Sequence, residues 1–556
     1  MLSYRHFIFL LLLWGGFSAM PFSLCAQNLQ VQVEGLEERF VPRQVEIDSS
    51  SWTIYSQSIL MQLRESGYWL ASLDSVSWQE ERVAFYFYQG RRYDQVQFEI
   101  TGEEGLEEKS FMPRRTHGIQ QVEDRLTRTI AQYENHGYPF ATLSIDSSYL
   151  QDDQLFLRLS VDPGMFITYD SLLVKPDDVL SAKFLSRYLG MPYGHYYDES
   201  KVQGIKDKLE NLPAVSLKSI SSSFRLQQAQ LALDLQAEKV NYFDGILGLV
   251  PANENRDKVQ LTGELNLSLK NLFKSAKQFE LHWEKFTDNS QMLDASYLHP
   301  VFLGTPLDLY VAYDQLKQDT LFSNRSLTLA FDYYLNGKAR IRASYENQLG
   351  NELNDASGES GNFRLDYYGV GIDFWQLDNR QFPREGQAFA LEAKVGQKET
   401  RIDTASNING TQYRLKAAFR TFHPIGRRMV LHGALSGGYL QGDPLYLNDL
   451  FRLGGLRSVR GFNENEFYAS RYAQFSLEWR FYLERRSYLV VFADQALMAY
   501  DIESGSFRDE PTGVGAGMQF DTSGGSFLIL YGLGRRRNEA FSFDSSKIHF
   551  GYTALF

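Results

Sequence analysis

Strict alternation of apolar and polar residues dominates the chain from about residue 240 onward. The clearest stretch covers residues 473–483, where odd positions are apolar or aromatic and even positions are mostly polar. Successive side chains of a β-strand point to opposite faces, so this pattern predicts a strand with one apolar and one polar face. Residues 547–556 alternate in the same way, with Ile548 and Phe550 set against Lys547 and His549.

Sixteen such segments follow one another. They are 241–250, 258–270, 278–285, 292–298, 306–314, 326–334, 339–348, 363–374, 388–395, 412–422, 429–439, 472–483, 488–500, 513–521, 526–534 and 547–556. An even number suits a closed antiparallel barrel, and in lipid only closure gives every backbone group a partner. We therefore predict a transmembrane β-barrel of sixteen antiparallel strands over residues 240–556. A water-soluble sandwich is the competing fold, and the aromatic Phe556 does not favour it.

A different pattern repeats between residues 27 and 239. An amphipathic helix expected over 57–67 ends at Gly67, and a second over 122–133 ends near Gly137. Glycine suits the left-handed backbone that closes a helix. Strand-like runs follow both helices at 83–88 and 155–161.

A third, weaker copy of this unit has a helix at 201–212 and strands at 215–224 and 231–235. We therefore expect three α+β units, over 27–92, 93–168 and 169–239.

The first 26 residues have the pattern of a signal peptide. Arg5 precedes an apolar core at 7–14, and Leu24-Cys25-Ala26 is a plausible cleavage site. A lipoprotein reading of Cys25 is disfavoured by the large Leu24 before it. Cleavage after Ala26 would remove the single cysteine, so no disulfide, thiol nucleophile or cysteine metal site is expected.

Composition supports a barrel over other classes. Aromatic residues make up 14% of the chain, with 40 Phe and 33 Tyr, and membrane barrels carry aromatic girdles at both interfaces. No later stretch approaches the roughly 20 apolar residues of a spanning helix. The net charge of −12 speaks against a nucleic-acid partner.

The connection between the eleventh and twelfth segments carries a distinctive motif, Val459-Arg460-Gly461-Phe462. It resembles the loop that folds into the lumen in the outer-membrane protein assembly and bacterial surface-antigen superfamily, of the BamA and TamA type. Segments 297–307, 378–386, 492–494 and 513–522 resemble other motifs of that family in the same order.

The resemblance implies that Arg460 lies inside the barrel. An unpaired charge there is costly, so Arg460 needs a carboxylate. By alternation Asp494 faces the lumen and is the first candidate, and Glu478 is the second. Gly513, Gly515 and Gly517 also point inward and leave room for the loop. The alternative is an Arg460 that lies in a solvated loop.

The resemblance further implies a bacterial outer-membrane protein, with its α+β (POTRA-like) units in the periplasm, that inserts or translocates polypeptides. No nucleotide-binding Gly-x-x-x-x-Gly-Lys-Ser/Thr loop is present, and no cofactor or metal is expected. Expected partners are outer-membrane lipids, unfolded client polypeptides and accessory periplasmic or inner-membrane proteins.

A mechanism can be placed at the seam between the first and last strands. Gly245, Gly248 and Gly551 weaken these strands, and Phe556 ends the second of them. A weak seam could open sideways, and exposed sheet edges of the units could bind a client as an added strand. The glycines could instead serve barrel curvature, and the units could be a spacer.

Three other functions stay open from the sequence. One is a two-partner-secretion pore that exports a dedicated protein; the strand at 29–33 and the three units, in place of a plug helix and two units, disfavour it. A barrel enzyme is disfavoured because no Gly-x-Ser-x-Gly motif or catalytic triad is found. A passive porin would leave the units and the loop motif unexplained. The run Arg535-Arg536-Arg537 is interpreted as a solvated turn or a lipid-headgroup contact.

Overall fold

The structure is a computed structural model. It describes residues 28–41, 46–48, 51–79, 82–93, 95–101, 117–151, 154–212, 214–251, 259–285, 289–335, 337–354, 358–380, 382–401, 407–456, 458–484, 486–522 and 525–553. The expected signal peptide and Phe556 lie outside these residues. The chain forms two compact units, the first comprising residues 1–170, 193–202 and 224–229 and the second the remainder.

The first α+β domain is a four-stranded sheet with one covering helix. Its strands, in the order β2-β1-β4-β3, are β2 (Glu46–Asp48), β1 (Asn28–Glu34), β4 (Arg82–Tyr88) and β3 (Ser72–Gln79). Helix α1 (Trp52–Glu65) packs Ile59 and Leu63 against Val83 and Phe85 of β4. The helix is followed by Gly67 with φ 98°, the helix-ending glycine that the sequence predicts.

The second domain repeats this arrangement. Its sheet has the order β6-β5-β8-β7, with β6 (His117–Gly118), β5 (Gln95–Thr101), β8 (Gln154–Asp162) and β7 (Thr142–Gln151). Helix α2 (Ile119–Glu134) is followed by Gly137, which also has φ 98°. In both domains the central pair of strands is parallel, β1 with β4 and β5 with β8.

A third sheet has the order β10-β11-β9, formed by β10 (Val215–Arg225), β11 (Gln228–Ala237) and β9 (Thr168–Lys175). Its helices are α3 (Ala182–Leu189), α4 (Glu199–Gln203) and α5 (Ile205–Leu209). The single helix expected over 201–212 is therefore wrong in detail, because the chain breaks at Gly204 into two short helices. None of the helices that the structure describes has the length and apolar character to cross a membrane.

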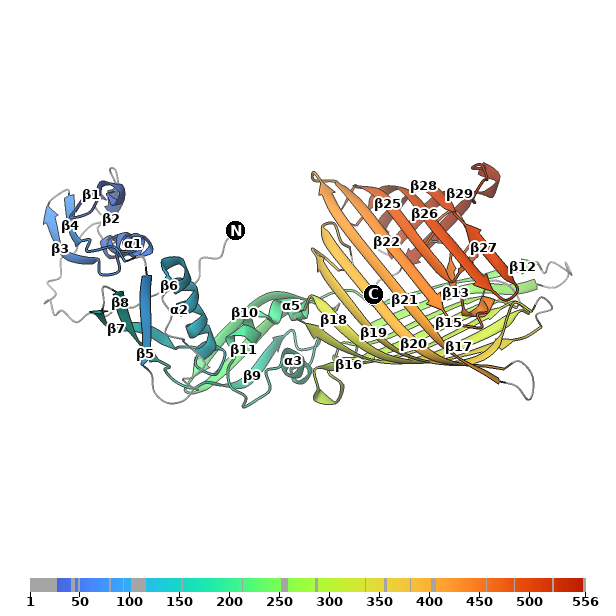
Figure 1. Ribbon diagram of the computed structural model, residues 1–556, viewed down its shortest axis with the longest axis horizontal. Coiled ribbons are helices and arrows are strands. Elements are labelled where there is room, and N and C mark those ends of the chain that lie inside the picture. The colour runs from blue at the N-terminus through green and yellow to red at the C-terminus, as the bar shows by residue number, and fades with distance from the viewer. Residues whose placement is uncertain are drawn as a thin grey trace. The chain divides into compact units, whose positions relative to one another are not determined.

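Seventeen strands between residues 242 and 553 form one antiparallel sheet that wraps around a lumen (Figure 1, green to red). Its strands are β12 (Tyr242–Pro251), β13 (Val259–Leu272), β14 (Lys277–Lys285), β15 (Gln291–His299), β16 (Leu307–Gln318), β17 (Phe322–Leu335), β18 (Ala339–Glu352), β19 (Asn362–Leu377), β20 (Gly386–Arg401), β21 (Asn407–Ile425), β22 (Met429–Gln441), β25 (Arg471–Tyr482), β26 (Tyr488–Ile502), β27 (Gly505–Asp509), β28 (Thr512–Thr522), β29 (Gly525–Arg535) and β30 (Lys547–Thr553). Both β27 and β28 pair with β26, so they form one interrupted strand position and the seventeen strands occupy sixteen positions. The sixteen-strand prediction is confirmed.

The alternation assigns the two faces of the barrel wall as the sequence predicts. In β25 the odd residues Phe475, Leu477 and Trp479 are exposed, whereas the even residues Ser476 and Glu478 are buried. Several strands extend beyond the alternating stretch. Strand β21 has 19 residues, because its two ends continue the ladders with β20 and β22 past residues 412–422.

The first and last strands of the sheet, β12 and β30, approach each other to Cα separations within 8 Å. Among the described residues no ladder of hydrogen bonds joins them: β12 pairs with β13, and β30 pairs with β29. We call this junction between β12 and β30, as the described residues define it, the seam.

Candidate functional site

The connection between β22 and β25 enters the barrel lumen. We call residues 442–470 the lumen loop. It contains a short antiparallel pair, β23 (Phe451–Leu453) and β24 (Phe467–Ala469), and the motif Val459–Phe462 lies between these strands. Val459 is fully buried and Arg460 is 6% exposed. The expected alternative of a solvated Arg460 is wrong.

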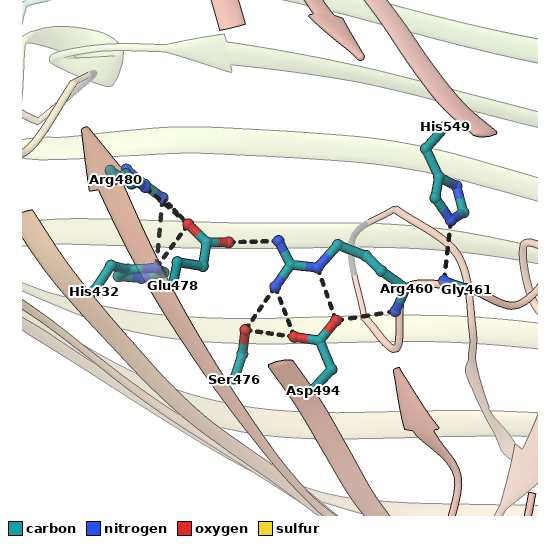
Figure 2. Close-up of polar contacts among 8 residues, drawn as sticks. All are labelled: His432, Arg460, Gly461, Ser476, Glu478, Arg480, Asp494 and His549. Carbon is teal, nitrogen blue, oxygen red and sulfur yellow. Dashed lines mark hydrogen bonds and ion pairs between the residues drawn. The ribbon is translucent and has the colours of Figure 1, made fainter. Parts of the chain in front are cut away.

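Arg460 is bound by Asp494 of β26. Its Nε and Nη2 donate to the two carboxylate oxygens of Asp494 at 2.7 and 2.6 Å, and its backbone N–H donates to Oδ2 at 3.0 Å (Figure 2). The planar guanidinium matches a carboxylate in this two-pronged geometry. The guanidinium also lies 3.9 Å from the ring centroid of Phe492, on the same strand face.

Glu478 of β25 binds the remaining side of the guanidinium. Arg460 Nη1 donates to Glu478 Oε1 at 2.6 Å, and Nη2 also donates to the Ser476 hydroxyl at 2.9 Å. Arg480 donates to the other oxygen of Glu478, which lies 3.3 Å from His432 Nδ1 (Figure 2). Two arginines thus face two carboxylates, and the four charges balance. Such pairing is what makes buried charge tolerable.

Glycines of the barrel wall lie behind the motif Val459–Phe462, which we call the tip of the lumen loop. A Cβ on Gly513 would lie 1.9 Å from the Arg460 carbonyl oxygen, and one on Gly534 would lie 2.6 Å from the Gly461 carbonyl oxygen. Gly461 has φ 92°, and its own added Cβ would meet the backbone of β29 at 2.7 Å. The inward orientation expected for Gly513 agrees with this packing. The loop and the wall therefore meet backbone to backbone.

Apolar contacts surround the charged network. Val459 and Phe462 pack with Leu453, Phe467 and Met498 in one buried cluster. The rings of Phe462 and Phe467 meet edge to face at 4.9 Å. Water is thereby kept from one side of the tip, which strengthens the ion pairs within.

A second anchor holds the start of the lumen loop. Lys398 of β20 is 1% exposed, and its Nζ donates to Asp449 at 2.5 Å and to the Pro444 carbonyl at 2.8 Å. Asn448 donates to the Gly361 carbonyl and accepts from the Gly361 N–H. The loop is thus fixed to the wall at two places, at β20 and at β25–β26.

The seam glycines lie where the sequence places them in the strands. Gly245 lies in β12, where an added Cβ would be 3.4 Å from the Glu264 carbonyl oxygen, and Gly551 lies in β30, facing Leu528 at 3.6 Å. Gly248 belongs to β12, opposite Thr262 of β13. Phe556 lies outside the described residues.

Sequence reasoning missed several members of the site. Lys398 and His432 lie on inward positions of their strands, and alternation alone assigns them to the lumen. Their partners Asp449 and Glu478 could not be paired with them, because strand periodicity says nothing of the path of a loop. Arg536, interpreted from the sequence as part of a solvated turn or a lipid-headgroup contact, binds Glu466 of the lumen loop at 2.7 Å.

Together these features define a class: a membrane-spanning β-barrel with a buried inward loop, preceded by repeated α+β domains. Residues 256–552 match the Omp85 superfamily domain, and the chain belongs to this superfamily. It is accordingly an outer-membrane protein with POTRA domains in the periplasm, and its family supports a role in inserting or translocating polypeptides.

Two solved structures of CdiB share this fold at low sequence identity, and a structure of BamA also matches. CdiB from Escherichia coli is 15% identical with a TM-score of 0.58, over 91% of this chain and 98% of that one. CdiB from Acinetobacter baumannii is 13% identical with a TM-score of 0.55, over 91% and 97%. BamA from Haemophilus ducreyi lacking POTRA domains 1–3 is 13% identical with a TM-score of 0.44, over 84% and 100%. No curated protein sequence matches this chain.

Proposed function

We propose that this protein inserts client polypeptides, chiefly β-barrel proteins, into the outer membrane through the seam between β12 and β30. The observation that carries the proposal is the seam itself. The two strands lie within reach of each other, yet no described ladder joins them. Each edge offers backbone donors and acceptors to which a client strand can bind.

The composition of the seam strands supports opening at this place. Gly245 and Gly248 interrupt β12, and Gly551 interrupts β30. Glycine within a strand adds little packing and loses much conformational freedom on folding, so it lowers the stability of the pairing. A client strand entering here would satisfy its backbone groups in the bilayer one strand at a time, without a nucleotide.

The periplasmic domains supply a route for delivery. We assign them to residues 27–92, 93–168 and 169–239. Strand β3 of the first sheet pairs only with β4, and β7 of the second pairs only with β8, among the described strands. These strands have 8 and 10 residues, long enough for an extended client to add as a further strand.

A disulfide across the seam tests the proposal. Cysteine pairs are scanned along β12 (Tyr242–Pro251) and β30 (Lys547–Thr553). The two strands run antiparallel, so positions near the end of β12 are combined with positions near the start of β30. The purified protein in liposomes is oxidised and supplied with an unfolded β-barrel client. We expect oxidation to stop client insertion and reduction to restore it, since a locked seam cannot take up a strand.

The matched control joins Leu267 to Leu281, neighbours in the β13–β14 ladder. This disulfide leaves the seam free, so insertion should continue. Full insertion by the locked seam would refute the lateral route. If the locked protein still passes a polypeptide across the membrane, export through the lumen becomes the function instead.

A further inference from the structure

The lumen loop touches the last strand of the barrel directly. The Gly461 N–H donates to Nε2 of His549 at 3.2 Å, and Figure 2 shows the imidazole of His549 directed toward this nitrogen. His549 lies in β30, opposite Leu530 of β29, and its side chain points inward. Gly461 directly follows Arg460, so the residue that touches β30 is adjacent to the one anchored on β25 and β26.

A second contact ties the loop to the segment that leads into β30. Arg536, one residue after β29, donates to Glu466 Oε1 at 2.7 Å, and its guanidinium lies 5.0 Å from the ring centroid of Phe467. Phe467 packs in the same buried cluster as Phe462 of the tip. The next residue, Arg537, donates its backbone N–H to Asp509 at 3.0 Å. Arg536 and Arg537 thus hold the segment between β29 and β30 in place.

These contacts matter because β30, as far as it is described, has a hydrogen-bonded neighbour on one edge only. Within the described residues its ladder runs along β29 alone, and its other edge faces the seam. A strand held on one edge depends more on side contacts than a strand held on both. The hydrogen bond from Gly461 and the ion pair at Arg536 supply such contacts from the lumen side.

We propose that the lumen loop is a latch on the last strand, with His549 as the positioning residue that receives it. With the tip seated on Asp494 and His549, β30 stays in the wall and the seam stays narrow. Withdrawal of the tip releases β30 and widens the seam. This inference rests on the proposed function, since it assigns the control of the same seam.

The test measures the width of the seam. Spin labels are placed at Phe243 of β12 and Ile548 of β30, which are 51% and 73% exposed, in a Cys25→Ser background, and the distance distribution is recorded in liposomes. His549→Leu removes the acceptor, and we expect the wide-seam population to rise about fivefold, as loss of one hydrogen bond implies. His549→Gln keeps an acceptor oxygen and should behave as wild type.

Lys547→Leu is the matched control. Lys547 lies on the same face of β30, and no described hydrogen bond joins it to the lumen loop. Arg536→Gln gives an independent measurement at a position that is 40% exposed and tolerates substitution. It should widen the seam as well. Heat-modified electrophoretic mobility shows that each variant is folded.

An unchanged distance distribution in folded His549→Leu would overturn the latch, and so would an equal change in Lys547→Leu. If His549→Leu does not fold, an unchanged distance in Arg536→Gln overturns it. The readout needs no client. A seam that responds to His549 while the disulfide-locked protein still inserts clients would leave the latch standing and remove the lateral route; the reverse result would remove the latch alone.

Discussion

Arg460 shows how a charged residue can be buried in the lumen of a barrel, against its wall. Its guanidinium donates to Asp494, Glu478 and Ser476, and its face lies on the ring of Phe492. Lysine could not reproduce this, because a single ammonium lacks the planar fork that meets two carboxylates at once. The site therefore specifies arginine by geometry as well as by charge.

The glycine wall gives a sharp prediction at this scale. Gly513→Ala would place a Cβ 1.9 Å from the Arg460 carbonyl oxygen, so the tip must move away from Asp494. Weakening the buried pair should cost about 3 kcal/mol, and a cysteine at the buried Val459 should react faster with maleimide. Gly371→Ala is the control, since its nearest neighbour would be 3.5 Å away. Equal labelling of the two variants would contradict the packing described.

The sequence indicates the side-chain partners of Arg460 but not the backbone contacts of the loop. Inward alternation selects Asp494 and Glu478 as candidate partners of Arg460, and both bind it. It could not indicate His549 as a partner of Gly461, because that contact joins a backbone N–H to a strand 88 residues away. A contact made by a backbone N–H does not depend on the side chain of that residue, so the pattern of apolar and polar residues does not reveal it.

At the scale of the element, one buried ion pair, Lys398 with Asp449, helps to anchor the start of the lumen loop. Lys398→Met leaves Asp449 buried without its cation, which should destabilise the loop by about 3–5 kcal/mol. Adding Asp449→Asn should recover part of this loss, because the unpaired charge is then gone. Protease cleavage within residues 442–450 measures the effect.

The exposed pair of Arg364 and Asp366 serves as the comparison. Arg364 is 60% exposed, so Arg364→Gln should cost under about 1 kcal/mol and leave the cleavage pattern unchanged. Equal protection of the loop from protease in Lys398→Met and in wild type would show that the ion pair of Lys398 and Asp449 does not stabilise the loop.

Elements were predicted well wherever a period is repeated. The strands of the barrel and helices α1 and α2 follow from alternation and from helical spacing ended by glycine. The sequence does not predict helix α3 or strands β23 and β24. The two strands have three residues each, which is too short to show a period, and α3 has only eight. Their positions depend on tertiary contacts.

At the scale of the whole molecule, the outward faces of the strands meet lipid. Leu435 of β22 is 53% exposed on this face, and Leu435→Arg should reduce the stability of the barrel in bilayers by up to about 2–4 kcal/mol. Its neighbour Ser436 faces the lumen, so Ser436→Arg should cost less. The folded fraction in lipid vesicles compares them, and an equal loss in both would argue against the assigned faces.

The number of barrel strands follows from the sequence, whereas the state of the seam does not. Alternation is a property of each strand taken singly, and sixteen alternating segments predict sixteen positions. Whether β12 pairs with β30 depends on the balance between ladder hydrogen bonds and curvature, which no local pattern records.

The tip of the lumen loop has its contacts on one flank of the wall, at β25, β26, β29 and β30. These contacts brace the last strands of the barrel, so we expect these strands to be stiffer than the first ones. Thermal fluctuations should be largest around β12. Under an applied force we therefore expect β12 to be displaced first, while the last strands keep their position.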